Sequence, residues 1–310
     1  MAFLRLPSLL FALQLCVVNH SAAMGLMLQE APAHCGAAPT ADAAPPAAAA
    51  NRLAQSKAVP GKKDIAWAWL GSPTMRYPHK ALGTVTHAGS LHVQVASPTG
   101  ALRELVYTLP VHKVFEDRIP RLVDIDRDGR DEILLVESDA LRGSALVVLG
   151  LRGKALLELA RGPFTGSTFR WLNPVGVADF DGDGKLDVAS VTTPHIGGIL
   201  TLHHYRPPAL VPYAKAMDTS NHRMGDLEQA LAVVVELPGV RPTVIVPDMG
   251  LRAVHALRWE ASSNAGETGQ WKELADVRAL PARVERITPI AGGGCVLLSD
   301  GSWRQLLLTN

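Results

Sequence analysis

Two nine-residue stretches of the sequence carry the same acidic pattern: DIDRDGRDE at Asp124–Glu132 and DFDGDGKLD at Asp179–Asp187. In both, carboxylates occupy positions 1, 3, 5 and 9, and a glycine occupies position 6. Gly129 and Gly184 therefore stand where a loop that curls around an ion must turn sharply. Calcium needs about six to eight oxygen ligands, which a short loop supplies only by curling in this way. The pattern predicts a calcium loop that occurs twice.

Alternate side chains of such a curl point inward, and the backbone carbonyl at position 7 adds one more oxygen. Carboxylates held this close would repel one another without a counter-ion. We expect calcium rather than magnesium, because a flexible, oxygen-rich loop suits the larger ion, and we expect a structural role for both ions. The alternative is that Asp-Gly clusters merely form turns on a solvated surface. The expected ligands are Asp124, Asp126, Asp128, Glu132 and the carbonyl of Arg130 in the first loop, and Asp179, Asp181, Asp183, Asp187 and the carbonyl of Lys185 in the second.

The residues that follow each loop favour strands over the helices of an EF-hand. An EF-hand needs a glutamate at loop position 12, where this sequence has Leu135 and Ser190. Apolar β-type runs follow instead, EILLVE from Glu132 and DVASVTT from Asp187. A unit of strand, acidic loop and strand resembles the FG-GAP or VCBS repeat family, the calcium-loop repeats of integrin-type β-propellers. The resemblance implies propeller blades whose first two strands are joined by the calcium loop.

The acidic loops lie 55 residues apart, and a fixed period of this size is typical of propellers and other repeat arrays. Strand-like runs continue at this period in both directions, although ELPGVRP replaces the acidic loop in the third copy. In the degenerate first copy we expect one strand at ALGTVTH, Ala81–His87. The last copy ends one strand short, and GLMLQEA at Gly25–Ala31 is the segment that could supply it. We predict an all-β fold, a β-propeller of about five four-stranded blades over residues 61–310.

The N-terminal region resembles a targeting segment followed by a linker. Arg5, an apolar run and small residues up to Ala23 predict a cleaved signal peptide over residues 1–23 and a secreted or periplasmic location. The apolar run is too short to cross a bilayer. A lipoprotein cysteine at Cys16 is the alternative, but Leu15 precedes it where a small residue is expected. Residues 24–60 are rich in Ala and Pro and predict a tail or linker, disordered or tethering over 31–60, which could donate the closing strand.

Three cysteines are present, and loss of Cys16 with a signal peptide would leave Cys35 and Cys295. An oxidising compartment favours a disulfide between them, which would tie the tail to the last blade. The alternative is two unpaired thiols. Secretion and calcium binding support each other, because extracellular modules bind calcium weakly.

Composition and motifs argue against several functional classes. A net charge of +1 and the lack of a basic, aromatic-rich patch argue against nucleic acid and anionic membranes as partners. GxSxG, P-loop, HExxH and dinucleotide motifs are missing, so we assign no catalytic residue. His203 and His204 should face opposite ways on one strand. Histidines in or near the connections between strands hint at a site at one end of a channel: His195, His222 and His255.

We therefore expect a non-catalytic binding or scaffold module that meets a protein or glycan surface. The alternative is a propeller enzyme, of the polysaccharide lyase or esterase type, with its site in the central channel. A compact cluster of His, Arg, Tyr or carboxylate side chains in that channel would favour the enzyme. A third possibility is that the Ala/Pro-rich tail tethers the propeller to a larger envelope assembly.

Overall fold

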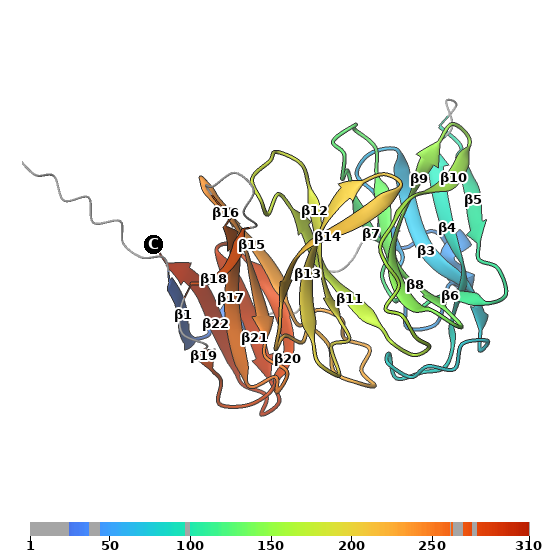
Figure 1. Ribbon diagram of the computed structural model, residues 1–310. Coiled ribbons are helices and arrows are strands. Elements are labelled where there is room, and N and C mark those ends of the chain that lie inside the picture. Colours follow the sequence, from blue (N-terminus) through green and yellow to red (C-terminus); the bar gives the residue numbers. More distant parts are fainter. Residues whose placement is uncertain are drawn as a thin grey trace, which may run out of the picture.

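The computed structural model describes residues 25–36, 44–96, 100–260, 262, 269–274 and 278–309. The expected signal peptide and Cys16 lie outside these residues. The described chain is all-β, which confirms the all-β part of the prediction (Figure 1). Its only helices within these ranges are two short 3-10 turns, η1 (Ala33–Gly36) and η2 (Ala47–Asn51). Neither they nor any other described segment forms a helix long and apolar enough to cross a membrane.

The strands fall into five groups along the chain, each built mainly of antiparallel neighbours. The first group is β2 (Val59–Pro60), β3 (Ile65–Thr74), β4 (His87–Ala96) and β5 (Leu102–Thr108). The second is β6 (Lys113–Phe115), β7 (Arg121–Val123), β8 (Glu132–Asp139), β9 (Gly143–Arg152) and β10 (Ala155–Arg161). The third is β11 (Leu172–Ala178), β12 (Asp187–Thr192), β13 (Ile199–Arg206) and β14 (Ala209–Ala216).

The last two groups follow the same plan. The fourth is β15 (Val233–Leu237), β16 (Val240–Pro247), β17 (Ala253–Glu260) and β18 (Gln270–Glu273), with β19 (Arg278–Ala279) beside β17. The fifth is β20 (Val284–Ile290), β21 (Gly293–Leu298), β22 (Trp303–Thr309) and β1 (Gly25–Glu30). Short bridges join the first three groups into one 13-stranded sheet. In Figure 1 the third group lies between the first two groups, at the right of the view, and the last two groups, at the left.

The central strands of the second, third and fourth groups are apolar on both faces because each of these groups lies between two cores. On β8, Ile133 and Leu135 enter a core shared with the first group, whereas Leu134 and Val136 enter a core shared with the third. Side chains alternate between the faces of a strand, so the continuous run EILLVE serves both cores. The same alternation places Ile245 of β16 in a core that also holds strands of the fifth group. Four such cores link successive groups within the described chain.

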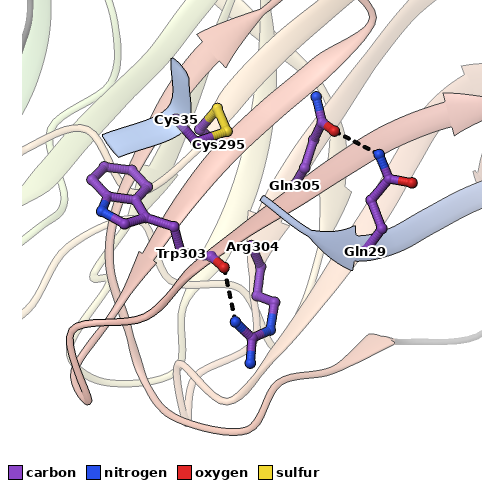
Figure 2. Close-up of a disulfide and its surroundings, with 6 residues drawn as sticks. All are labelled: Gln29, Cys35, Cys295, Trp303, Arg304 and Gln305. Atoms are coloured by element: carbon purple, nitrogen blue, oxygen red, sulfur yellow. Dashed lines mark hydrogen bonds between the residues drawn. A yellow bond between two sulfur atoms is a disulfide. The ribbon is translucent and has the colours of Figure 1, made fainter. Parts of the chain in front are cut away.

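The N-terminal strand lies where a donated outer strand was expected. β1 pairs antiparallel with β22, so a segment from the start of the chain completes the fifth group. Gln29 donates a 2.6 Å hydrogen bond to Gln305 across this pair (Figure 2). Five residues beyond β1, a disulfide joins Cys35 to Cys295 of β21. The start and the end of the chain are thus held together both by a strand pair and by a covalent bond.

Two expectations for the N-terminal half need correction. Residues 44–60 are not a disordered linker: Ala49 and Leu53 are buried, and the Leu53 N–H donates to the carbonyl of Leu70. Residues 81–86 form turns instead of a strand, because Gly83 has φ +73° and Leu82 is drawn into the core between the second and third groups. The short β2 takes the vacant place in the first group.

We expect removal of the disulfide to weaken the whole fold. A Cys35→Ser/Cys295→Ser double variant should lose about 2–5 kcal/mol of unfolding free energy, because the bond closes a loop of 260 residues. Denaturant unfolding of both proteins, with and without a reducing agent, measures the loss. Reductant should lower the stability of the wild type and leave the double variant unchanged. Equal midpoints for the two oxidised proteins would contradict the role given to this bond.

Buried histidines should make the fold sensitive to acid. Burial lowers the pKa of His203 to about 4 and that of His222 to about 3, below the usual value of about 6.5. The unfolded chain therefore binds more protons between these values, and stability should fall as the pH drops from about 6.5 to about 4. Each such histidine contributes a slope of about 1.4 kcal/mol per pH unit in that window.

The contribution of His203 can be isolated with a matched pair of variants in chelator. His203→Gln should make the slope shallower than that of the wild type between pH 6.5 and 4. His112→Gln, at a side chain that is 55% exposed, serves as the control and should follow the wild type. Denaturant titrations at several pH values give the slopes, and parallel curves for His203→Gln and wild type would refute the prediction.

Candidate functional site

Both acidic loops are the connections of β-hairpins. The first joins β7 to β8 and the second joins β11 to β12, so strands flank both loops and an EF-hand is excluded. The register is the same: Val123 pairs with Glu132, and Ala178 pairs with Asp187. The residue before position 1 therefore lies opposite position 9 in each loop. Hairpin register alone brings the last carboxylate back to the first.

The same three hydrogen bonds from a backbone N–H to a carboxylate occur within each of the two loops. The glycine N–H at position 6 donates to the carboxylate at position 1, from Gly129 at 3.1 Å and from Gly184 at 2.9 Å. Position 5 donates to position 3, and position 7 donates to position 5, in both loops. Both glycines have positive φ, +87° and +86°, while a Cβ would meet nothing within 4 Å at either. The backbone angle, and not the space available, requires glycine here.

In the first loop three of the predicted carboxylates converge. One oxygen from each of Asp124, Asp126 and Glu132 lies within 4.8 Å of the other two, and Asp128 stays outside this group. Asp124 Oδ1 and Glu132 Oε1 are buried and accept no hydrogen bond from the described residues. Buried polar atoms without a partner are rare and costly. These two oxygens are suitable ligands for a cation.

Basic side chains near the first loop neutralise it only in part. Lys63 Nζ lies 3.6 Å from Asp124 Oδ2, and Arg152 Nη1 lies 3.8 Å from Glu132 Oε1. Both distances are too long for hydrogen bonds. Burial raises the pKa of Glu132 to about 7, and the neighbouring Asp126 adds to the shift. The loop therefore disfavours its own full ionisation, as expected for carboxylates that a cation would stabilise.

In the second loop the convergent carboxylates are Asp179, Asp181 and Asp183. Asp187, at position 9, instead receives hydrogen bonds from His204 Nδ1 at 3.1 Å and from the Tyr213 hydroxyl at 2.9 Å. The two rings stack with centroids 3.9 Å apart. Burial raises the pKa of Asp187 to about 6. Three of the four predicted carboxylates thus converge in each loop, and in the second loop Asp187 forms a separate group with Asp181 and His204.

One side chain connects the loops to each other. Arg127 Nη1, in the first loop, donates a 2.7 Å hydrogen bond to the carbonyl of Gly184 in the second. A cavity of about 470 Å³ lies beside this contact, with Tyr205 in its wall. The repeat period thus brings the two loops together in space as neighbours, although the sequence separates them by a whole repeat.

The predicted histidines divide between two places. His195, in the turn after β12, and His222, in the connection after β14, lie together with Nε2 of His195 2.8 Å from Nδ1 of His222. His222 Nε2 lies 3.0 Å from the carbonyl of Asp226 and must donate to it. His255 lies elsewhere and contacts Glu273 of the neighbouring strand. His203 is buried, and the adjacent His204 is half-buried beside Asp187.

The sequence analysis missed a buried histidine–carboxylate pair. His79 Nδ1 lies 2.6 Å from Glu116 Oε1, and the other oxygen of Glu116 accepts a 2.6 Å hydrogen bond from the Ser138 hydroxyl. Glu116 is fully buried, and so are Asp117 and Arg118 next to it. The run of three charged residues, Glu116 to Arg118, was the local signal of this site in the sequence.

Comparison with known proteins found a similarity, which covers the acidic loops. A search of curated proteins found no match. The sequence model of the FG-GAP-like repeat matches residues 124–190, which run from the first acidic loop through the second and into β12. The match includes both acidic loops, from which the resemblance was inferred, and the strands β8 to β11 between them. Residues 124–190 are thus similar to the FG-GAP-like repeat, as the two acidic loops predicted.

Proposed function

We propose that the protein is a secreted or periplasmic β-propeller that is stabilised by two calcium ions and acts as a non-catalytic binding or scaffold module. The first acidic loop carries this proposal, because it holds two buried carboxylate oxygens without a hydrogen bond. The second loop has the same hydrogen bonds from backbone N–H groups to its carboxylates. A hard cation, which prefers oxygen ligands, would give the two buried oxygens of the first loop a partner and would fit the second loop in the same way.

The propeller would have five blades, one for each strand group. Its support is the series of four shared cores, which stacks each group on the next. At the remaining boundary the N-terminal segment runs from the fifth group to the first, where Leu53 joins the core of the first two groups. β1 and the Cys35–Cys295 bond would then hold the ring closed. Closure also covers the sheet edge that an open array would expose.

The ions would sit in the hairpin loops. Asp124, Asp126 and Glu132 would hold the first, with the carbonyl of Arg130, and Asp128 would support the loop. Asp179, Asp181 and Asp183 would hold the second, with the carbonyl of Lys185. Asp187 would act mainly by fixing the loop, since both its oxygens already accept hydrogen bonds. Bound calcium supplies the positive charge that the carboxylates need.

The disulfide and the calcium loops support the proposed location, and the ring shape supports the proposed kind of partner. A disulfide persists in an oxidising compartment, which supports secretion. Calcium is also abundant enough outside the cytosol to fill weak sites of this kind. A propeller presents its strand connections at the two ends of the ring. A protein or glycan surface that meets one of these ends is the partner that we propose.

Chelation provides the direct test of the calcium role. Excess chelator should lower the melting temperature, and Asp126→Asn and Asp181→Asn should each reproduce part of this drop because each removes one convergent carboxylate. Asp300→Asn is the matched control, since Asp300 is an exposed turn aspartate outside both loops. Calorimetry in calcium and in chelator measures all four proteins. A melting curve of the wild type that does not respond to chelator would refute the proposal.

A second candidate function is an enzyme with its site among the buried polar groups. The specific observation is the His79–Glu116 pair, in which a buried carboxylate orients an imidazole as it does in many acid–base sites. Tyr77 packs nearby, and its ring lies edge-on to that of His79. Such a cluster is the feature by which a lyase or esterase would differ from a binding module.

The enzyme candidate predicts turnover that depends on His79. Wild type should release product from a uronate-containing polysaccharide or a nitrophenyl ester, and His79→Asn should reduce the rate by about 100-fold or more. His112→Asn, at an exposed site, is the control. Absorbance of the unsaturated sugar or the nitrophenolate follows the reaction. No turnover above that of heat-denatured protein on either substrate would refute this candidate.

A further inference from the structure

A cavity of about 800 Å³ opens away from the acidic loops. β12 begins at Asp187 of the second loop, and the turn after its other end supplies Pro194 and His195 to the cavity wall. The connection after β14, the turn after β16 and residues beside β20 and β21 complete the wall. Small-molecule sites in proteins have volumes of about 300–1,000 Å³. The calcium role proposed above makes no use of this cavity.

Hydrogen bonds fix the segments that form the wall. The Ser220 hydroxyl donates to the carbonyl of Pro194 at 2.8 Å, and its N–H donates to the carbonyl of Pro247 at the same distance. The Val284 N–H donates to the carbonyl of Leu251, again at 2.8 Å. Connections from three strand groups are thus tied to one another. A binding site held in this way is preorganised for its ligand.

The charges of the wall favour an anion. Arg223 forms ion pairs with Asp226 and Glu285, which hold it in place. Arg252 and Arg283 also line the cavity, and neither guanidinium has a hydrogen bond or ion pair with any residue of the described chain. Leu251 and Val284, joined by the backbone hydrogen bond just described, are their chain neighbours, so the two arginines leave the backbone at one place. Arginine is the side chain best suited to bind a carboxylate through two parallel hydrogen bonds.

His195 adds an acceptor to this wall. Because His222 Nε2 must donate to the carbonyl of Asp226, its Nδ1 accepts, and His195 Nε2 is the donor. Nδ1 of His195 then carries a lone pair and has no partner in the described chain. Burial lowers the pKa of His195 to about 4, so the ring is neutral near pH 7. The ring also lies parallel to Trp171, at 9°. A ligand that contacts Nδ1 must donate a hydrogen bond, as a hydroxyl does.

We propose that this cavity binds a carboxylate that carries hydroxyl groups, either as a uronic acid residue of a glycan or as a free sugar acid. Arg252 and Arg283 bind the carboxylate, and His195 Nδ1 accepts from a hydroxyl. Met249 and Leu251 offer apolar surface to the carbon skeleton. A neutral sugar would leave the guanidinium groups without an anion, and a plain fatty acid would leave the imidazole without a donor. The inference deepens the proposed binding function by naming the class of ligand.

Isothermal titration in calcium, with matched probes, tests the ligand class. Trigalacturonate or gluconate should bind at least about tenfold more tightly than galactotriose, which lacks the carboxylate, and than hexanoate, which lacks the hydroxyls. Tighter binding of trigalacturonate assigns a glycan, and tighter binding of gluconate assigns a free sugar acid. Equal affinity for galactotriose or hexanoate would overturn the proposal.

Variants of Arg252 and Arg283 test whether these two residues bind the ligand. Arg252→Gln and Arg283→Gln should each weaken binding of the tighter acidic probe by about tenfold, because each loses a charged hydrogen bond. Arg103→Gln, at an exposed arginine of β5, is the matched control and should bind like wild type. Melting curves show that each variant folds. Wild-type affinity in both cavity variants would refute the assignment.

The outcomes separate this inference from the calcium proposal. If none of the probes binds a protein whose melting temperature still falls in chelator, the cavity assignment is wrong and the calcium-stabilised scaffold stands. If gluconate or trigalacturonate binds in the arginine-dependent way to a protein that does not respond to chelator, the cavity assignment stands and the calcium role is wrong.

Discussion

Burial of both faces of the central strands is the constraint on which the rest of the structure depends. On β8 the alternating side chains of EILLVE enter two different cores, one with the group before and one with the group after. A strand of this kind cannot leave either face to solvent, so each group must stack on its neighbours. A shift of one residue in the register would exchange the two faces. The hairpin register that positions the acidic loops follows from this packing.

The sequence predicted well what depends on local pattern. Apolar runs gave the strands after both loops, and the missing outer strand of the last group pointed to Gly25–Ala31. Composition was a poorer guide, because the Ala- and Pro-rich segment hides single anchoring residues such as Leu53, which is almost fully buried. The strand predicted at residues 81–86 was also wrong, because Gly83 takes a left-handed backbone angle that an extended strand does not allow.

The candidate sites also differ in whether their residues lie close together in the sequence. Residue spacing within nine positions identified the acidic loops, since all the candidate ligands lie on one hairpin. His79 and Glu116 are 37 residues apart, and His195 and His222 are 27 apart, so only the fold brings each pair together. Likewise, Asp187 meets His204 and Tyr213 because β13 pairs with β12, and β14 pairs with β13, in a particular register. No periodicity in the sequence carries that information.

The two acidic loops differ in how much they need an ion. At position 9 of the second loop, both oxygens of Asp187 accept hydrogen bonds, from His204 of β13 and Tyr213 of β14, so the protein itself holds this end of the loop. At the same position of the first loop, Glu132 keeps a buried oxygen without a hydrogen bond. Arg127 then ties the less satisfied loop to the better supported one, through the Gly184 carbonyl. This hydrogen bond is a direct link between the two hairpins, through which order in the first loop would favour order in the second.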